Sequence, residues 1–236
     1  MGKVYWAVTT LSSEDGIPAL RAYLDRSFPL GENQVYLDRL MGYKGRSALP
    51  RVVAARLGAL ALLPPMLALA GIQPAGIRFT RDENGRPYGR DVSGGGIPFD
   101  FNLSHSDAHA VCTLLIGDGR VGVDVEEPVS VGRALPLIRR YCTEGEQKML
   151  MGRTDREQAQ IFTRIWTLRE AISKQDGRGY PLKFDASLVP DAVRVFCASL
   201  PDTGTQISIC TPADVGLADL IGVSAGSDVL WEPMES

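Results

Sequence analysis

The alternation of hydrophobic and polar residues predicts a strand at the start of the chain and one dominant helix further along. Lys3–Thr10 is rich in aromatic and β-branched residues, which is typical of a strand. In Ile161–Tyr180 the apolar residues recur every three to four positions, and Gly177 and Gly179 indicate the end of this helix. The pattern also predicts helices at Glu14–Asp25, Tyr43–Leu63 and Val131–Arg140, and strands at Ile77–Thr80, Phe101–Ser106, Val111–Ile116, Arg120–Val125, Val193–Ala198, Gln206–Cys210 and Leu220–Ser224.

Two local signals refine this outline. Gly117-Asp118-Gly119 separates two apolar strands and predicts a hairpin. Thr143-Glu144-Gly145-Glu146 fits a capping box, which predicts the start of another helix. Strands and helices interleave without the regular rhythm of a parallel sheet, so the predicted class is α+β.

Composition narrows the classes of function. A net charge of −3 shows no general footprint for nucleic acid. The chain has 4 cysteines without a CxxC pair and only 2 histidines, which favours buried reduced thiols over zinc or disulfides. No signal peptide is visible, and the apolar run Val52–Gly71 contains Arg56 and is interrupted by Pro64-Pro65. We therefore expect a cytoplasmic protein of one large or two small domains, not bound to membranes.

Trp166, Glu170 and Lys174 are spaced four residues apart on the dominant helix, so they lie along one stripe. An aromatic ring, a carboxylate and an ammonium on one stripe suit a ligand, a metal and a phosphate. A core tryptophan beside an ordinary surface ion pair has the same spacing. Taken alone, the helix favours this second interpretation.

Asp124 and Glu126 lie two residues apart on a predicted strand and share one face, while Val121, Val123 and Val125 occupy the other. Two carboxylates on one face repel each other unless a cation lies between them, and a hard ion such as Mg²⁺ prefers such oxygen ligands. The alternative is an exposed strand face, which the buried valines make less favourable.

Ser104 and His105 are neighbours on a strand, so they point to opposite faces and cannot form a nucleophile–base dyad. Hydrogen-bond donors for an anionic ligand are the better interpretation. Arg86 lies on a Gly-Pro turn and supplies a charge suited to phosphate. Arg51 and Arg56 are interpreted as a solvated helix face.

Four segments occur in a characteristic order and spacing. They are Gly85-Arg86-Pro87, Phe101-Asn102-Leu103-Ser104-His105-Ser106, Gly122-Val123-Asp124-Val125-Glu126 and the helical run Trp166–Gly177, WTLREAISKQDG. Together they resemble the motifs of the surfactin-type 4'-phosphopantetheinyl transferase family. The resemblance runs from about Tyr43 to Pro181.

The resemblance implies two similar α+β halves related by a pseudo-twofold axis, at residues 1–118 and 119–236, with coenzyme A between them. The hairpin around Gly119 would join the halves. It also implies that Asp124, Glu126 and Glu170 ligate Mg²⁺, or Mn²⁺ in its place.

The same resemblance assigns further roles. Glu170, Lys174 and Glu146 would be catalytic, with Glu146 acting as a metal ligand or as the base. The phosphates of coenzyme A would be held by Arg46, Arg86, Ser104, His105 and Lys174. The implied reaction moves the phosphopantetheine arm of coenzyme A to a serine of an apo acyl or peptidyl carrier protein, and we expect a monomeric enzyme. The alternatives are a non-catalytic coenzyme A or nucleotide-binding homologue and a hydrolase that uses Cys142 or Ser104.

Two departures from the family pattern stand out. Arginine replaces the usual lysine at Arg86 and Arg169, and a planar guanidinium does not have the geometry of an ammonium. The region of Gly31, Glu32 and Asn33 has no match to the basic residues that some members use for the 3'-phosphate.

Overall fold

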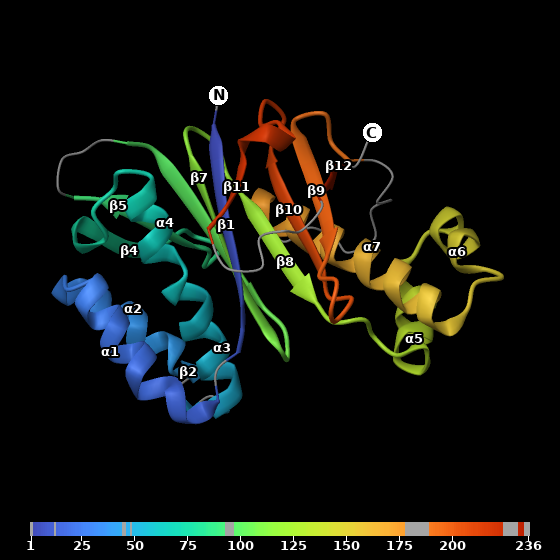
Figure 1. Cartoon of the computed structure of the whole chain (residues 1–236), viewed down its shortest axis with the longest axis horizontal. Coiled ribbons are helices and arrows are strands. Elements are labelled where there is room, and N and C mark those ends of the chain that lie inside the picture. The colour runs from blue at the N-terminus through green and yellow to red at the C-terminus, as the bar shows by residue number, and fades with distance from the viewer. Residues whose placement is uncertain are drawn as a thin grey trace.

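Two four-stranded sheets lie at the centre of the described residues, with helices on their outer sides (Figure 1). The structure is a computed structural model that describes residues 2–11, 13–43, 46–47, 49–92, 97–177, 189–223 and 231–233, without the side chains of residues 43, 46, 47 and 131. The mixture of sheets and helices agrees with the predicted α+β class.

The first sheet has the order β11-β1-β7-β6, with β1 parallel to β11 and antiparallel to β7. Its strands are β1 (Lys3–Thr10), β6 (Phe99–His105), β7 (His109–Ile116) and β11 (Leu220–Gly222). The two faces of β1 alternate as a strand requires. Val4, Trp6 and Val8 pack toward the second sheet, whereas Tyr5 and Ala7 face the N-terminal helices.

The second sheet has the order β12-β9-β10-β8 and is antiparallel. Its strands are β8 (Gly122–Glu126), β9 (Val193–Ser199), β10 (Gln206–Pro212) and β12 (Glu232–Pro233). Val121, Val123 and Val125 are fully buried against the first sheet, as the sequence predicts. The long helix α7 (Asp155–Asp176) covers the outer face, where Leu168 and other apolar residues pack on β9 and β10.

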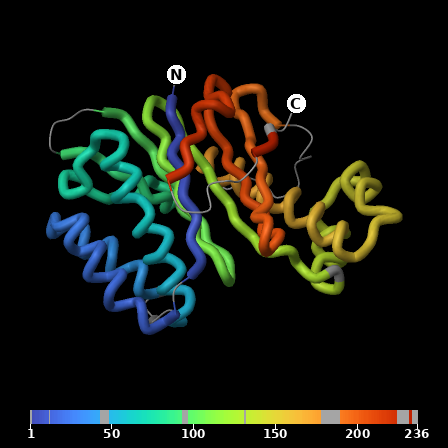
Figure 2. Tube along the Cα trace, in the orientation of Figure 1, coloured from blue at the N-terminus to red at the C-terminus, as the bar shows by residue number. Residues whose placement is uncertain are grey.

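The N-terminal helices cover the outer face of the first sheet (Figure 2). The helices on this side are η1 (Glu14–Gly16), α1 (Ile17–Ser27), α2 (Gly31–Leu40), α3 (Pro50–Ala61), α4 (Leu63–Leu69) and η2 (Pro74–Gly76). Two short strand pairs accompany them: β2 (Gly42–Tyr43) with β3 (Arg46–Ser47), and β4 (Ile77–Arg81) with β5 (Pro87–Asp91). The remaining elements are α5 (Val131–Tyr141), α6 (Glu144–Leu150) and η3 (Leu217–Asp219). In Figure 1, α5 and α6 project from the side opposite α1 and α2.

The prediction of one helix over Tyr43–Leu63 was wrong at its start. Gly42–Tyr43 and Arg46–Ser47 pair as two short strands, and α3 begins only at Pro50. Proline suits the first helical turn because its missing N–H would have no helical partner there. The predicted helix at Glu14–Asp25 is likewise a 3₁₀ turn followed by α1, and a second helix, α4, follows α3 with Pro64-Pro65 in its first turn.

The predicted hairpin at Gly117–Gly119 was also wrong. β7 and β8 belong to different sheets, so this turn carries the chain from one sheet to the other. β8 does run beside β6, but two backbone amides of this segment donate their hydrogen bonds to side chains of β6. The amide of Val121 donates to Asp100 Oδ2 at 2.8 Å, and the amide of Val123 donates to Asn102 Oδ1 at 3.0 Å.

Several other predictions from the sequence agree with the structure. α7 ends at Gly177, whose φ of 76° is left-handed, whereas Gly179 and Ser224 lie outside the described residues. The capping box at Thr143 and Glu146 is present, and the tail strands lie where the sequence predicts them. All four cysteines are free and buried, and burial raises the pKa of each thiol.

The apolar run has the character of a core segment. By length and composition Pro50–Leu69 is apolar enough to cross a membrane, but 61% of its most apolar window is buried inside the fold. The buried residues include Leu57, Leu60, Leu63 and Met66, which pack in the core beneath the first sheet. The core helix of a soluble protein passes the same length test.

Candidate functional site

Three predicted site residues meet where β6, β8 and α7 come together. Lys174 Nζ lies 2.5 Å from Asp124 Oδ1 and donates to Ser104 Oγ at 2.8 Å. Ser104 Oγ in turn donates to Asp124 Oδ1 at 2.8 Å. Lys174 therefore forms its ion pair with Asp124, a carboxylate on strand β8.

A backbone contact fixes this meeting point. A Cβ atom on Gly122 would lie 2.0 Å from the carbonyl oxygen of Ala171, so only glycine allows α7 to approach β8 this closely. Asp124 follows Gly122 by two residues, and Lys174 follows Ala171 by about one helical turn. The approach of the two backbones thus brings the carboxylate and the ammonium together.

Asp124 is buried but not fully paired. Its side chain is 5% exposed, and Oδ2 has no hydrogen-bond partner among the described residues. Lys174 is 29% exposed, so the pair is open to solvent on the side of the ammonium. A buried carboxylate oxygen without a partner is costly unless a cation or donor reaches it.

Glu126 and Glu170 are half-buried acids that feel the charge of Asp124. Burial, reinforced by Asp124 and Glu127, raises the pKa of Glu126 to about 7. Burial also raises the pKa of Glu170, with Lys174 lowering it and Asp124 raising it. Yet no group of three His, Cys, Asp or Glu side chains in the described part of the chain is arranged to hold a metal ion.

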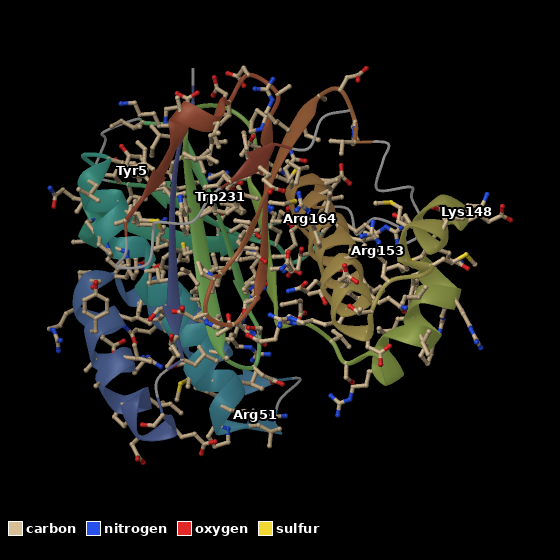
Figure 3. All side chains as sticks on the ribbon, turned by 45° about the vertical axis from the view of Figure 1, so that its right-hand side comes forward. Tyr5, Arg51, Lys148, Arg153, Arg164 and Trp231 are labelled. Carbon is tan, nitrogen blue, oxygen red and sulfur yellow. The ribbon has the colours of Figure 1, made fainter. Side chains whose placement is uncertain are left out.

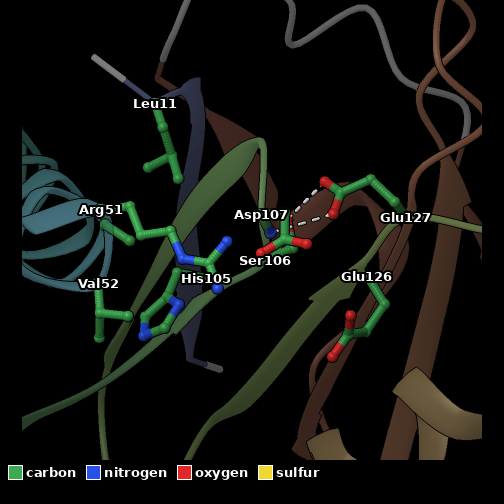
Figure 4. A pocket seen from close by; sticks show the side chains of 9 residues that line it. Leu11, Arg51, Val52, His105, Ser106, Asp107, Glu126 and Glu127 are labelled. Atoms are coloured by element: carbon green, nitrogen blue, oxygen red, sulfur yellow. Dashed lines mark hydrogen bonds between the residues drawn. The ribbon is translucent and has the colours of Figure 1, made fainter. Parts of the chain in front are cut away.

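A pocket of about 280 Å³ has Glu126 of this group of acids in its wall (Figure 4). The wall also includes His105 and Arg51, which reaches in from α3 (Figure 4) and is labelled on that helix in Figure 3. Burial, together with the neighbouring cations Arg56 and Lys174, lowers the pKa of His105, which favours the neutral form of its ring. Ser104 bonds to Asp124 while His105 lines this pocket, so the two neighbours have separate environments, as the strand geometry predicts.

Glu127 stabilises the turn at Ser106 and Asp107, and all three residues line this pocket. The sequence analysis did not identify Glu127 as a site residue. Its carboxylate accepts hydrogen bonds from Ser106 Oγ at 2.6 Å and the amide of Asp107 at 3.1 Å, and lies 2.9 Å from His109 Nδ1. Burial opposes ionisation, but these bonds hold the pKa of Glu127 below its ordinary value. The only signal in the sequence was its position next to Glu126.

Arg51 was interpreted as part of a solvated helix face, and it is exposed, but it also lines the pocket. Arg56 is half-buried, and its guanidinium donates to the carbonyl of Gly42 at 2.9 Å. The side chain of Arg46 lies outside the described residues, so its predicted phosphate contact stays a prediction.

Arg86 is buried and bound to protein. Its guanidinium pairs with the carboxylate of Asp100 and donates to the carbonyls of Lys174 and, at 2.9 Å, Val121. Burial lowers the pKa of Arg86, against the raising effect of Asp100. The side chain joins the turn before β5 to β6, to the start of β8 and to the end of α7, and its predicted phosphate contact stays a prediction.

Glu146 lies in a second buried ion pair. Arg169 Nη2 donates to Glu146 Oε2 at 2.5 Å, and the two side chains are only 2% and 4% exposed. Glu146 also caps α6 by accepting from the amide of Thr143 at 2.8 Å. Trp166, at the start of the predicted stripe, packs against Tyr141 and Phe162, so this part of the stripe is core.

Comparisons with known proteins agree with this arrangement. A family model described as "4'-phosphopantetheinyl transferase superfamily" matches residues 120–215, which include β8 and α7. Over 110 residues the chain is 28% identical to the 4'-phosphopantetheinyl transferase Sfp of Bacillus subtilis strain 168, covering 47% of this chain and 46% of that protein. Over 125 residues it is 33% identical to the 4'-phosphopantetheinyl transferase AcpT of Salmonella typhimurium, covering 52% and 64%.

A further relative is the 4'-phosphopantetheinyl transferase HetI of Nostoc, 30% identical over 110 residues, with 46% of this chain and 45% of that protein covered. The chain spans about half the length of the curated relatives it matches. Residues 120–215 are thus similar to the 4'-phosphopantetheinyl transferase superfamily. The similarity to Sfp and to a second Bacillus subtilis 4'-phosphopantetheinyl transferase supports the surfactin-type family that the four motifs predict.

Proposed function

We propose that this protein transfers the 4'-phosphopantetheine arm of coenzyme A to a serine of an apo acyl or peptidyl carrier protein and releases adenosine 3',5'-bisphosphate. The observation that carries the proposal is the convergence of Ser104, Asp124 and Lys174 near a pocket, with Asp124 and Lys174 inside the region that the superfamily model matches. The nucleophile is the hydroxyl of the carrier protein, so the enzyme requires no serine or cysteine nucleophile of its own.

The basic and hydroxyl groups of the cluster bind the diphosphate of coenzyme A in this proposal. Lys174 is partly exposed and Ser104 lies beside it, so both are positioned to donate to phosphate oxygens. His105, whose lowered pKa favours the neutral ring, offers an N–H donor from the pocket wall. Such donors stabilise the charge that develops on the leaving phosphate.

The acids of the site fit a divalent cation by their chemistry. Asp124, Glu126 and Glu170 provide the carboxylate oxygens that Mg²⁺ or Mn²⁺ prefers, and Asp124 Oδ2 is buried without a partner among the described residues. We propose that these three residues hold the ion. Bound there, it would neutralise charge on the diphosphate.

The structure favours one of the two alternatives for the base. Glu146 is committed to the cap of α6 and to Arg169, and it is nearly inaccessible. A carboxylate of the Asp124 cluster, acting through water, is the better candidate to take the serine proton.

Other features of the resemblance belong to the same proposal. We propose that residues 1–118 and 119–236 are two similar halves related by a pseudo-twofold axis, and that the protein is a cytoplasmic monomer. The crossing of the chain between the two sheets at Gly117–Gly119 supports this boundary.

The decisive experiment incubates the protein with coenzyme A, Mg²⁺ and a panel of apo-carrier proteins from fatty acid, polyketide and nonribosomal peptide synthesis. Mass spectrometry should show one carrier class gaining the mass of phosphopantetheine at its serine. The control is the Asp124→Asn variant, which should leave the carriers unmodified. Binding of coenzyme A without any transfer would favour the non-catalytic homologue instead.

A further inference from the structure

Lys174 occupies the place on Asp124 that a cation would take. Its ammonium lies 2.5 Å from Asp124 Oδ1, although Asp124 is one of the three acids proposed to bind the metal. We propose that Lys174 is a built-in counter-ion of the metal site, which keeps Mg²⁺ affinity low until the phosphates of coenzyme A draw the ammonium away. This inference rests on the proposed function and adds an order of events to it.

The geometry of Asp124 shows why the ammonium and a metal compete. Lys174 Nζ and Ser104 Oγ both bond to Oδ1, while Oδ2 is buried without a partner among the described residues. A divalent ion on this carboxylate would therefore lie close to the ammonium, and like charges repel strongly where water is excluded. Ser104 is neutral, so its hydroxyl does not oppose a metal ion on Asp124 by charge.

The other two acids show that the site is not assembled. Glu126 and Glu170 are half-buried near Asp124, but the three carboxylates do not converge into a metal site in the described residues. With Lys174 in place, one of the three negative charges is already balanced. Removal of the ammonium would leave all three acids to be balanced by the metal alone.

Lys174 is also placed to leave. Its side chain is 29% exposed, whereas that of Asp124 is 5% exposed, so the ammonium is the mobile partner. A diphosphate is a stronger partner for an ammonium than a single carboxylate oxygen, since it carries more charge and more acceptors. Binding of diphosphate and binding of metal then favour each other, and this coupling is reciprocal.

The test measures Mn²⁺ binding directly, by the electron paramagnetic resonance signal of the free ion, on the full chain. Without coenzyme A we expect Lys174→Met to bind Mn²⁺ at least about tenfold more tightly than the wild type, a coupling of ordinary size. Saturating coenzyme A should tighten Mn²⁺ binding in the wild type, after subtraction of the Mn²⁺ that free coenzyme A binds. Coenzyme A should tighten Mn²⁺ binding much less in Lys174→Met.

Matched variants separate this role from a merely structural one. Lys174→Arg keeps the charge and should retain weak metal binding, whereas Lys174→Gln should behave like the methionine variant. Asp124→Asn added to Lys174→Met should remove the gained affinity. Arg78→Met, which breaks an exposed ion pair with Glu32 away from the site, should leave Mn²⁺ binding unchanged.

Equal Mn²⁺ affinity of wild type and Lys174→Met in the absence of coenzyme A overturns the proposal, as does a gain in Lys174→Arg equal to that in Lys174→Met. A thermal melt of each variant confirms that the measured protein is folded. Because no transfer is needed for this readout, failure to modify a carrier would count against the proposed function alone.

Discussion

Two of the ion pairs to which helix α7 contributes the basic partner differ in one important respect. Lys174 meets Asp124 and Arg169 meets Glu146, both at 2.5 Å. The Lys174 side chain is 29% exposed, whereas both members of the other pair are almost fully enclosed, at 2% and 4%. One pair can open toward a ligand, and the other can open only if the fold opens.

The presence of a buried atom without a hydrogen-bond partner does not distinguish the two ion pairs. Among the described residues, Asp124 Oδ2 and Arg169 Nε are both buried without a hydrogen-bond partner. What separates the pairs is access, because a pocket opens beside the Asp124 cluster and includes Glu126 and His105 in its walls. Buried ion pairs without access are maintained by the fold and are strongly destabilised when one partner is removed.

The largest expected effect is at the open pair. Asp124→Ala should lower the rate of carrier modification by at least about 10³-fold, roughly 4 kcal/mol in activation free energy, because the proposed metal site loses one of its three carboxylates. The thermal midpoint should change little, since Lys174 can turn into solvent. Excess EDTA should inactivate the wild type in the same assay, and full activity in EDTA would refute the metal assignment.

The closed pair should behave in the opposite way. Arg169→Met leaves the buried carboxylate of Glu146 without its guanidinium counter-ion, so we expect a loss of about 3–5 kcal/mol in the free energy of unfolding, measured by urea denaturation. Adding Glu146→Leu should recover much of this loss. The transfer rate per folded molecule should stay near that of the wild type. A stable Arg169→Met protein without activity would instead place this pair in the reaction.

Arg86 gives an intermediate case. In Arg86→Lys a single ammonium cannot bridge Asp100 and the carbonyls of Val121 and Lys174 as the guanidinium does, so we expect a loss of about 1.5–3 kcal/mol in stability. Calorimetric titration of coenzyme A and dephospho-coenzyme A then tests the predicted phosphate contact. If Arg86 binds the 3'-phosphate, Arg86→Ala loses the preference between the two ligands.

The smallest effect should come from a surface pair. Arg78 and Glu32 are 48% and 57% exposed and lie 2.9 Å apart. Arg78→Ala should cost less than about 1 kcal/mol in stability and leave transfer unchanged. A larger change in urea denaturation would show that exposure is a poor guide to the strength of ion pairs in this protein.

Local patterns predicted the parts of the fold that depend on neighbouring residues. The alternation of Asp124 and Glu126 with Val123 and Val125 assigned both faces of β8 correctly, because a strand has a period of two. The start of α7 was missed, since residues 155–160 are polar apart from Ala159 and the apolar stripe begins at Ile161. The capping box of Thr154 and Glu157 carried the missing signal.

Long-range contacts could not be predicted in this way. The turn at Gly117–Gly119 was recognisable, but nothing local shows that its two strands join different sheets. The charge of Arg86 was evident, but its burial depends on Asp100, which follows by 14 residues in another strand. The family resemblance likewise assigned Glu146 to the same site as Asp124, although Glu146 lies in an enclosed ion pair and Asp124 in a partly exposed one.

The parallel pairing of β11 with β1 has a consequence for synthesis of the chain. β1 leaves the ribosome before the other strands of its sheet, whereas Leu220–Gly222 emerges after all of them. Until then one edge of β1 has unpaired N–H and C=O groups, which can recruit strands from other chains. The first sheet therefore cannot be completed until β8, β9 and β10 of the second sheet have been synthesised, and an N-terminal fragment cut at the turn between the sheets would lack β11.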